Sequence, residues 1–106
     1  MHYLLFYDFI GDYTERRTAY RADHLRHAQS AVDRGELLLG GALADPADTG
    51  VLLFDGASAE IAEAFARADP YVLAGIVTGW RVRPWTTVVG APALCPNPLT
   101  AGPKNG

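Results

Sequence analysis

Residues 2–10 read HYLLFYDFI, a run in which both alternating sets of side chains are largely apolar. Aromatic residues and leucine at this density favour a β-strand. A strand that is apolar on both faces needs cover on each side, because apolar surface left in water costs free energy. This stretch therefore predicts a sheet whose two faces are both covered.

A long helix is expected next, over residues 13–34. Asp12 followed by Glu15 has the acceptor-then-carboxylate spacing of a helix start, and Gly35 marks the end. One stripe of this helix should face the sheet, and it consists of Thr18, Leu25, Ala28 and Val32. Arg21 falls inside that stripe.

The middle of the chain predicts a hairpin. Residues 37–43 form a strand in which Gly40 and Gly41 mark a bulge or a close backbone approach. Residues 45–50 are dense in turn formers and lead to a second strand at residues 51–54.

The last third predicts a second helix and a final strand. Ser58 is a suitable N-cap, and Asp69-Pro70 ends the helix because proline disfavours the α conformation in the residue before it. Residues 76–82 follow as a strand. The predicted fold class is therefore α+β, a ferredoxin-like β-α-β-β-α-β order with a four-stranded antiparallel sheet and two helices on one face.

The length of 106 residues fits one domain, which we place at residues 1–90. Residues 91–106 carry four of the seven prolines and are predicted as an irregular arm, either loose or wrapped on a partner chain. The uncovered sheet face predicts a homodimer that packs sheet to sheet. Trp80 and Trp85 are expected to fill that interface.

Charge and cysteine content exclude several partners. The formal net charge is −3, and the arginines near the chain start alternate with acidic residues, so no nucleic acid is expected. The lone Cys95 cannot form an intramolecular disulfide and has no zinc-like neighbours, which predicts a reducing cytoplasm and no metal. No stretch approaches the roughly 20 apolar residues needed to span a bilayer.

Several segments together resemble the YciI-like, or YCII-related, proteins over residues 2 to about 90. Their shared features are the aromatic first strand, the passage Gly35-Glu36-Leu37-Leu38-Leu39-Gly40-Gly41 and the end Val82-Arg83-Pro84-Trp85. The most specific are Arg21-Ala22-Asp23-His24-Leu25 and Ala68-Asp69-Pro70-Tyr71-Val72-Leu73-Ala74-Gly75.

The resemblance implies a dimeric α+β barrel with a proposed active-site pair, which falls here on His24 and Asp69. Most family members have no assigned reaction, and a few relatives are lyases or dehalogenating enzymes that act on small unsaturated acids. The wider superfamily includes muconolactone isomerases and cofactor-free monooxygenases. The proline-rich arm departs from the short C-terminus usual in the family, which affects the expected access to the pocket.

Each of the two residues has a structural alternative. His24 can act as a general acid or base near neutral pH, or it can cap a carbonyl or pack on an aromatic ring. His2 is terminal and His27 is expected to point to water, so His24 is the one histidine predicted at a pocket wall. Asp69 can orient His24, or it can accept backbone N–H bonds at the helix end.

Three further residues are candidates for substrate binding. Arg21 can bind a substrate carboxylate or pair with Asp69 or Asp23, and we expect the structural pairing. Tyr7 can offer its hydroxyl to a pocket, although an aromatic residue on a strand is commonly core or interface. Gly41 can expose a backbone N–H to a ligand, although a plain bulge is the simpler interpretation.

The sequence contains no phosphate-binding glycine loop, no serine nucleophile elbow and no metal cluster. Together with these absences, the resemblance implies a cofactor-independent enzyme of the lyase, isomerase or dehydrohalogenase type, acting on a small unsaturated or carbonyl-containing acid. The alternative is a non-catalytic dimeric protein that binds a metabolite. A third interpretation, a heme or quinone-type oxygenase, predicts a coloured protein or oxygen uptake.

Overall fold

Four strands form one antiparallel sheet in a computed structural model that describes residues 1–95. The strands are β1 (His2–Phe9), β2 (Leu37–Ala42), β3 (Thr49–Asp55) and β4 (Val77–Trp85). The helices are α1 (Tyr13–Arg16), the 3₁₀ turn η1 (Arg17–Ala19), α2 (Arg21–Asp33), α3 (Glu60–Ala68) and α4 (Pro70–Leu73). The order in the sheet is β2-β3-β1-β4. The predicted α+β fold class is confirmed.

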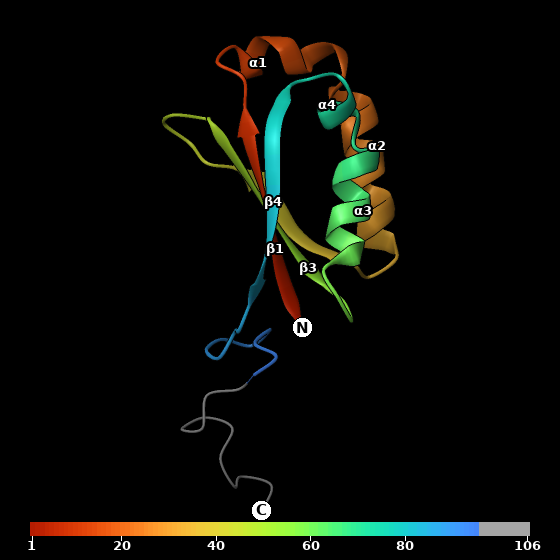
Figure 1. The fold of residues 1–106 in the computed structure, drawn as a ribbon, viewed down its shortest axis with the longest axis vertical. Helices are drawn as coiled ribbons and strands as arrows, with labels where there is room; N and C mark the ends of the chain where they lie inside the picture. The colour runs from red at the N-terminus through yellow and green to blue at the C-terminus, as the bar shows by residue number, and fades with distance from the viewer. Residues whose placement is uncertain (96–106) are drawn as a thin grey trace, which may run out of the picture.

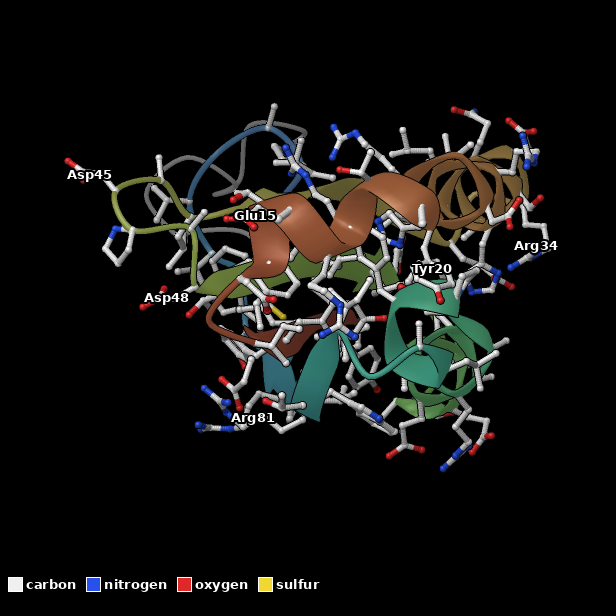
Figure 2. All side chains as sticks on the ribbon, turned by 90° about the horizontal axis from the view of Figure 1, so that it is seen from above. Glu15, Tyr20, Arg34, Asp45, Asp48 and Arg81 are labelled. Carbon is white, nitrogen blue, oxygen red and sulfur yellow. The ribbon has the colours of Figure 1, made fainter. Side chains whose placement is uncertain are left out.

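The helices α2, α3 and α4 lie together on one face of the sheet, and α1 crosses its upper end (Figure 1). Between the two layers is a core whose fully buried members include Leu5, Phe54, Ala62, Phe65 and Ile76. Charged side chains such as Glu15, Arg34 and Asp45 lie at the periphery (Figure 2). The sheet therefore has one covered face and one open face in the single chain.

Strand β1 is central, and its register positions the site. Tyr7 lies opposite Gly50 on β3 and opposite Trp80 on β4. Because side chains alternate across a strand, Tyr7 shares the helix-covered face with Leu5. Tyr7 is buried, and its ring points into the space between sheet and helices.

The first helical region is not one helix, in contrast to the prediction for residues 13–34. It begins at Tyr13 as expected, but the Asp12 side chain makes no capping hydrogen bond. The backbone breaks at Tyr20 (φ −115°, ψ −3°), whose carbonyl then accepts the first hydrogen bond of α2 from the His24 N–H. The buried Tyr13 ring stacks on Phe9 at 3.8 Å and holds α1 across the sheet end, whereas α2 runs along the sheet, so the chain must turn between them.

The predicted sheet-facing stripe of this region is only partly correct. Ala31 is the buried residue of α2, while Leu25 is 48% exposed and Val32 is 44% exposed. Both side chains line a cavity between α2 and the sheet. Helical periodicity identified the side that faces the sheet, but not that the helix stands away from it.

One prediction about strand details holds in one of its two alternatives, and another is corrected. The register of β2 shifts between Leu37 and Leu39, so the irregularity precedes the glycines, and the close approach is at Gly40, where an added Cβ would lie 3.3 Å from Leu52. Trp80 faces the helices, with the Arg67 guanidinium 6.0 Å from its ring centre, and cannot fill an interface on the open face.

The open face presents apolar side chains from three strands, namely Leu4, Phe6, Val51, Leu53 and Trp85. The segment after β4 returns to this face at the start of β1. There the buried His2 Nδ1 and Thr87 Oγ1 are 2.8 Å apart, and Thr87 Oγ1 also accepts the Leu94 N–H. Of the predicted arm, residues 96–106 lie outside the described residues.

Candidate active site

The junction between α3 and α4 places a carboxylate inside the protein. Asp69 is extended (φ −70°, ψ 124°), as expected before proline, and Pro70 begins α4. The Asp69 side chain caps this short helix, because Oδ1 accepts the Tyr71 N–H at 2.9 Å. Asp69 is completely buried, so all its hydrogen bonds must come from the protein or from a bound molecule.

The same carboxylate contacts the histidine of α2. His24 Nδ1 lies 2.8 Å from Asp69 Oδ1. Since a carboxylate only accepts, Nδ1 carries the hydrogen and donates it, which leaves a lone pair on Nε2 of the neutral ring. The imidazole also stacks on Tyr71, with ring centres 3.9 Å apart and planes 4° from parallel. His24 is held in one tautomer and one orientation.

Tyr7 completes a row of three polar side chains. Its hydroxyl donates to Asp69 Oδ2 at 2.7 Å, so Asp69 accepts three hydrogen bonds in all. Burial raises the pKa of Tyr7, and the charge of Asp69 and the hydrogen bond to it raise that pKa further. Tyr7 therefore remains a donor at neutral pH, and it fixes Asp69 instead of offering its hydroxyl to a ligand.

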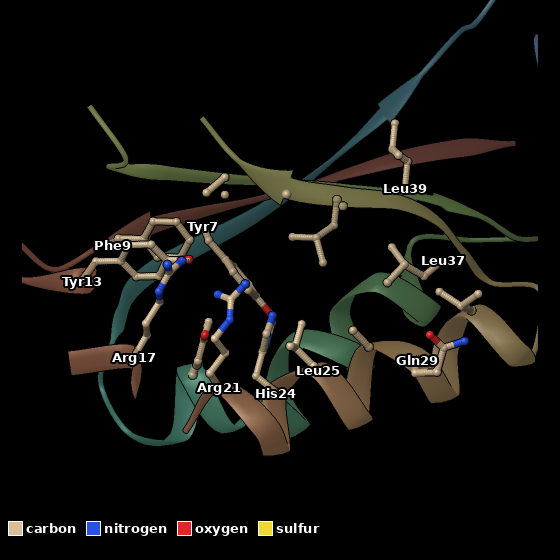
Figure 3. A pocket seen from close by; sticks show the side chains of 18 residues that line it. Tyr7, Phe9, Tyr13, Arg17, Arg21, His24, Leu25, Gln29, Leu37 and Leu39 are labelled. Atoms are coloured by element: carbon tan, nitrogen blue, oxygen red, sulfur yellow. Dashed lines mark hydrogen bonds between the residues drawn. The ribbon is translucent and has the colours of Figure 1, made fainter. Parts of the chain in front are cut away.

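A cavity of about 500 Å³ lies beside this row. Its polar end is formed by Tyr7, His24, Arg17, Arg21 and three aromatic residues, Phe9, Tyr13 and Tyr71. Its aliphatic wall consists of Leu25, Val32, Leu37, Leu39 and Leu52. Figure 3 shows Arg17, Arg21 and His24 rising from the helices toward the sheet. A cavity of this size with few polar groups at one end is typical of a small-molecule site.

Arg21 does not make the structural ion pair that the sequence favoured. Asp69 is bound by His24 and Tyr7, and Asp23 pairs with Arg26. Within residues 1–95, Arg21 forms no ion pair and lines the cavity instead. The reason is that His24, one helical turn further along α2, occupies the carboxylate.

The other sequence candidates fall in different places. Gly41 borders the cavity on β2, opposite Val51 in the register, and no atom lies within 4 Å of an added Cβ. His27 does not point to water, since it stacks on Phe65 and its Nε2 lies 2.9 Å from the Phe65 carbonyl oxygen. His2 is buried near Thr87, away from the cavity.

Sequence reasoning missed Arg17, Tyr13 and Tyr71 as cavity residues. The spacing of four between Tyr13 and Arg17 was a usable signal, because such residues share a side of a helix. Tyr71 had no comparable signal. Its importance depends on the stacking with His24, which joins residues far apart in the sequence.

Residues 1–86 match the family model described as the YCII-related domain. The chain belongs to this family. The chain is also 35% identical over 97 residues to Protein YciI of Escherichia coli and to Protein YciI of Shigella flexneri. Each alignment covers 83% of this chain and 99% of the relative. The sequence resemblance is therefore confirmed.

A solved structure shares the fold of this YCII-related protein. It is the 5-chloro-2-hydroxyhydroquinone dehydrochlorinase of Burkholderia phenoliruptrix in complex with 2,5-dihydroxybenzoquinone. The TM-score is 0.69 at 18% identity, and the match covers 82% of this chain and 95% of the other. At that identity the likeness establishes the fold alone.

Residues 1–95 contain neither a membrane-spanning helix nor a metal-binding cluster of side chains. No helix there combines the length and apolarity needed to cross a membrane. No group of three or more histidine, cysteine, aspartate or glutamate side chains there is arranged to hold a metal ion.

Proposed function

We propose that this YCII-related protein is a cofactor-independent enzyme for a small substrate, in which His24 transfers a proton. The observation that carries the proposal is the hydrogen-bonded row Tyr7–Asp69–His24 at the wall of a cavity of about 500 Å³. The buried Asp69 carboxylate accepts three hydrogen bonds, one of them from His24 Nδ1. His24 Nε2 has no protein partner within residues 1–95.

The row can perform acid–base chemistry next to a carbonyl group. His24 Nε2 removes a proton from a carbon beside the carbonyl. The C–H electron pair forms a C=C bond and the C=O π pair moves onto the oxygen, which gives an enolate. Asp69 stabilises the imidazolium that forms, and Tyr7 keeps Asp69 in place.

The enolate then has two outcomes. Return of the proton from His24 to another carbon gives an isomerase. Alternatively, a leaving group departs from the neighbouring carbon with its bonding electron pair, which is the reaction of a lyase or dehydrohalogenase. The proton then passes from His24 to water. The dehydrochlorinase name of the structural relative supports including a halide among the leaving groups.

A proton-transfer assay tests the proposal directly. Wild type is incubated with 5-chloro-2-hydroxyhydroquinone while chloride release is followed, and with small 2-oxo acids in D₂O while exchange at carbon 3 is followed by NMR. Whichever of the two reactions wild type catalyses, we expect His24→Ala to lower its rate by about 100-fold or more, because general acid–base catalysis contributes that much. Asp69→Asn should also lower it, because a neutral amide does not stabilise the imidazolium as the carboxylate does.

His27→Gln is the matched control, because His27 lies outside the cavity and glutamine can still donate to the Phe65 carbonyl. Its rate should equal that of wild type. A His24→Ala protein that folds and retains the wild-type rate rules the mechanism out. The alternative, a protein that only binds a metabolite, predicts no turnover in wild type and altered affinity in His24→Ala.

Two expectations about the whole protein remain proposals. We propose that two copies associate through the open sheet face, because no helix covers it and its apolar residues Leu4, Phe6, Val51 and Leu53 are only partly buried in the single chain. A cytoplasmic location remains a prediction that rests on the single Cys95.

A further inference from the structure

The Tyr71 hydroxyl is a buried donor without an acceptor among residues 1–95. Tyr71 is 1% exposed, and within residues 1–95 its hydroxyl is the one buried side-chain polar atom that makes no hydrogen bond. Its backbone N–H and its ring are both used, by Asp69 and His24 respectively. Buried hydroxyls almost always have a partner, because leaving one unpaired is costly. Tyr71 lines the cavity, so a molecule there can supply the missing acceptor.

Two arginines bring positive charge to the same end of the cavity. Arg17 donates to the Tyr13 hydroxyl at 3.2 Å and lies 5.1 Å from the centre of that ring. Arg21 stands between Arg17 and His24 in Figure 3. Within the described part of the chain neither guanidinium pairs with a carboxylate. The one acidic group at this end, Asp69, is already bound by three donors.

Tyr71 is protonated in these surroundings at neutral pH. Burial raises its pKa and the neighbouring Tyr13 adds to the rise, while Arg21 and Arg17 act in the opposite direction. Arg21 contacts the hydroxyl as a donor and lowers its pKa through that contact as well as through its charge. A guanidinium cannot accept a hydrogen bond, so the O–H still has no acceptor among the described residues. A protonated phenol beside two guanidinium groups is suited to an anionic oxygen.

We propose that the Tyr71 hydroxyl, together with Arg21 and Arg17, binds the anionic oxygen of a planar conjugated acid. The planar class follows from the flat aromatic surfaces of the cavity, where the imidazole is parallel to Tyr71 and Phe9 is parallel to Tyr13. If the proposed function holds, this acid is its substrate. The same donors then stabilise the negative charge that reaches a conjugated oxygen when His24 removes a proton.

Binding of benzoate, compared with its neutral analogue benzamide, tests the subsite without any turnover. By titration calorimetry or NMR, wild type should bind benzoate at millimolar concentration and benzamide at least about tenfold more weakly, because a charge-assisted hydrogen bond is worth about that factor. Tyr71→Phe and Arg21→Gln should each weaken benzoate binding about tenfold.

The control variants each remove a hydroxyl or a guanidinium group from a residue outside the cavity. Tyr20→Phe removes an exposed hydroxyl, and Arg16→Gln removes an exposed guanidinium on α1. Both should bind benzoate within about twofold of wild type, since the hydroxyl and the guanidinium that are removed make no described hydrogen bond or ion pair with the cavity end. Equal binding of benzoate and benzamide, absence of benzoate binding, or wild-type affinity in Tyr71→Phe overturns the proposal.

Thermal unfolding separates a ligand-binding role from a structural one. Without ligand, Tyr71→Phe should have a melting temperature equal to or above that of wild type, because the variant no longer buries an unpaired hydroxyl. The rise in melting temperature that benzoate gives wild type should be lost in it. A lower melting temperature with benzoate affinity unchanged overturns the proposal. The anion-binding proposal and the proposed function fail separately. If His24 proves inactive, benzoate binding that depends on Tyr71 still supports the anion subsite. If Tyr71→Phe binds benzoate as wild type does, turnover that depends on His24 still supports the proposed function.

Discussion

Asp69 combines a structural and a chemical position in one side chain. Oδ1 caps α4 through the Tyr71 N–H and also accepts from His24, while Oδ2 accepts from Tyr7. The sequence left open whether this residue orients His24 or caps a helix, and its contacts include both. Tyr7 is the better residue for a test of the row, because its hydroxyl makes one hydrogen bond there.

Tyr7→Phe should lower stability and also change its dependence on pH. At neutral pH we expect a loss of about 1–3 kcal/mol, because Asp69 Oδ2 is left buried without its donor. The pKa of Tyr7 is raised in the folded state, so the unfolded chain loses this proton first, near its ordinary value of 10.0. The folded state then binds more protons than the unfolded one, and stability falls with rising pH.

The contribution of Tyr7 is therefore complete below about pH 10 and decreases above it. Urea unfolding of wild type, Tyr7→Phe and the exposed control Tyr20→Phe at about pH 7 and about pH 10.5 measures the difference. Between the lower and the higher pH, wild type and Tyr20→Phe should lose more stability than Tyr7→Phe. Parallel losses in all three proteins contradict the assignment.

The pairing of His24 with Asp69 could be anticipated from the sequence only through the family resemblance. Nothing local connects a residue of α2 with one that follows α3. Residue type gave His24 and Asp69 ordinary structural roles as well. The unpaired hydroxyl of Tyr71 could not be anticipated at all, because an absent partner is a property of the packed structure.

At the scale of elements, strand positions were predictable and interruptions were not. Alternating apolar residues and turn formers identified β1, β3 and β4, whose pattern follows local geometry. No glycine or proline marks the break at Tyr20 in the sequence. The break lies between α2 and a first helix that the packing of Tyr13 on Phe9 holds at the sheet end. Gly50 was read as part of a turn, yet it lies within β3 opposite Tyr7.

Gly50→Ala should destabilise the protein by about 1–3 kcal/mol, as overpacking of a core does. An added Cβ would lie 2.8 Å from Phe9 Cζ and 3.2 Å from Tyr7 Cβ. The Phe9 ring cannot swing aside freely, because it stacks on Tyr13.

Gly41→Ala on the neighbouring strand is the matched control, since nothing lies within 4 Å of its added Cβ. Its free energy of unfolding should change by no more than about 0.5 kcal/mol. Urea unfolding compares the two variants. Equal stability in both contradicts the close approach at Gly50.

At the scale of the whole molecule, the proposed dimer depends on the open sheet face. We expect wild type to be a dimer by light scattering at micromolar concentration. Leu53→Lys, in the middle of β3 on that face, should give a monomer, because a buried unpaired ammonium group is strongly unfavourable.

Leu73→Lys is the control, because Leu73 is an exposed leucine on α4, on the helix-covered side. It should remain a dimer. A monomeric wild type, or a dimeric Leu53→Lys protein, contradicts association through the open face.

The division of the cavity into a polar end and an aliphatic wall allows the wall to change in evolution independently of the polar end. Side chains such as Leu25, Val32 and Leu39 belong to the wall and take no part in the polar row. Exchanges among them alter the room available to a ligand while the side chains of the polar row keep their positions. Homologues with one shared chemistry can thus diverge in the compounds they accept by altering aliphatic volume alone.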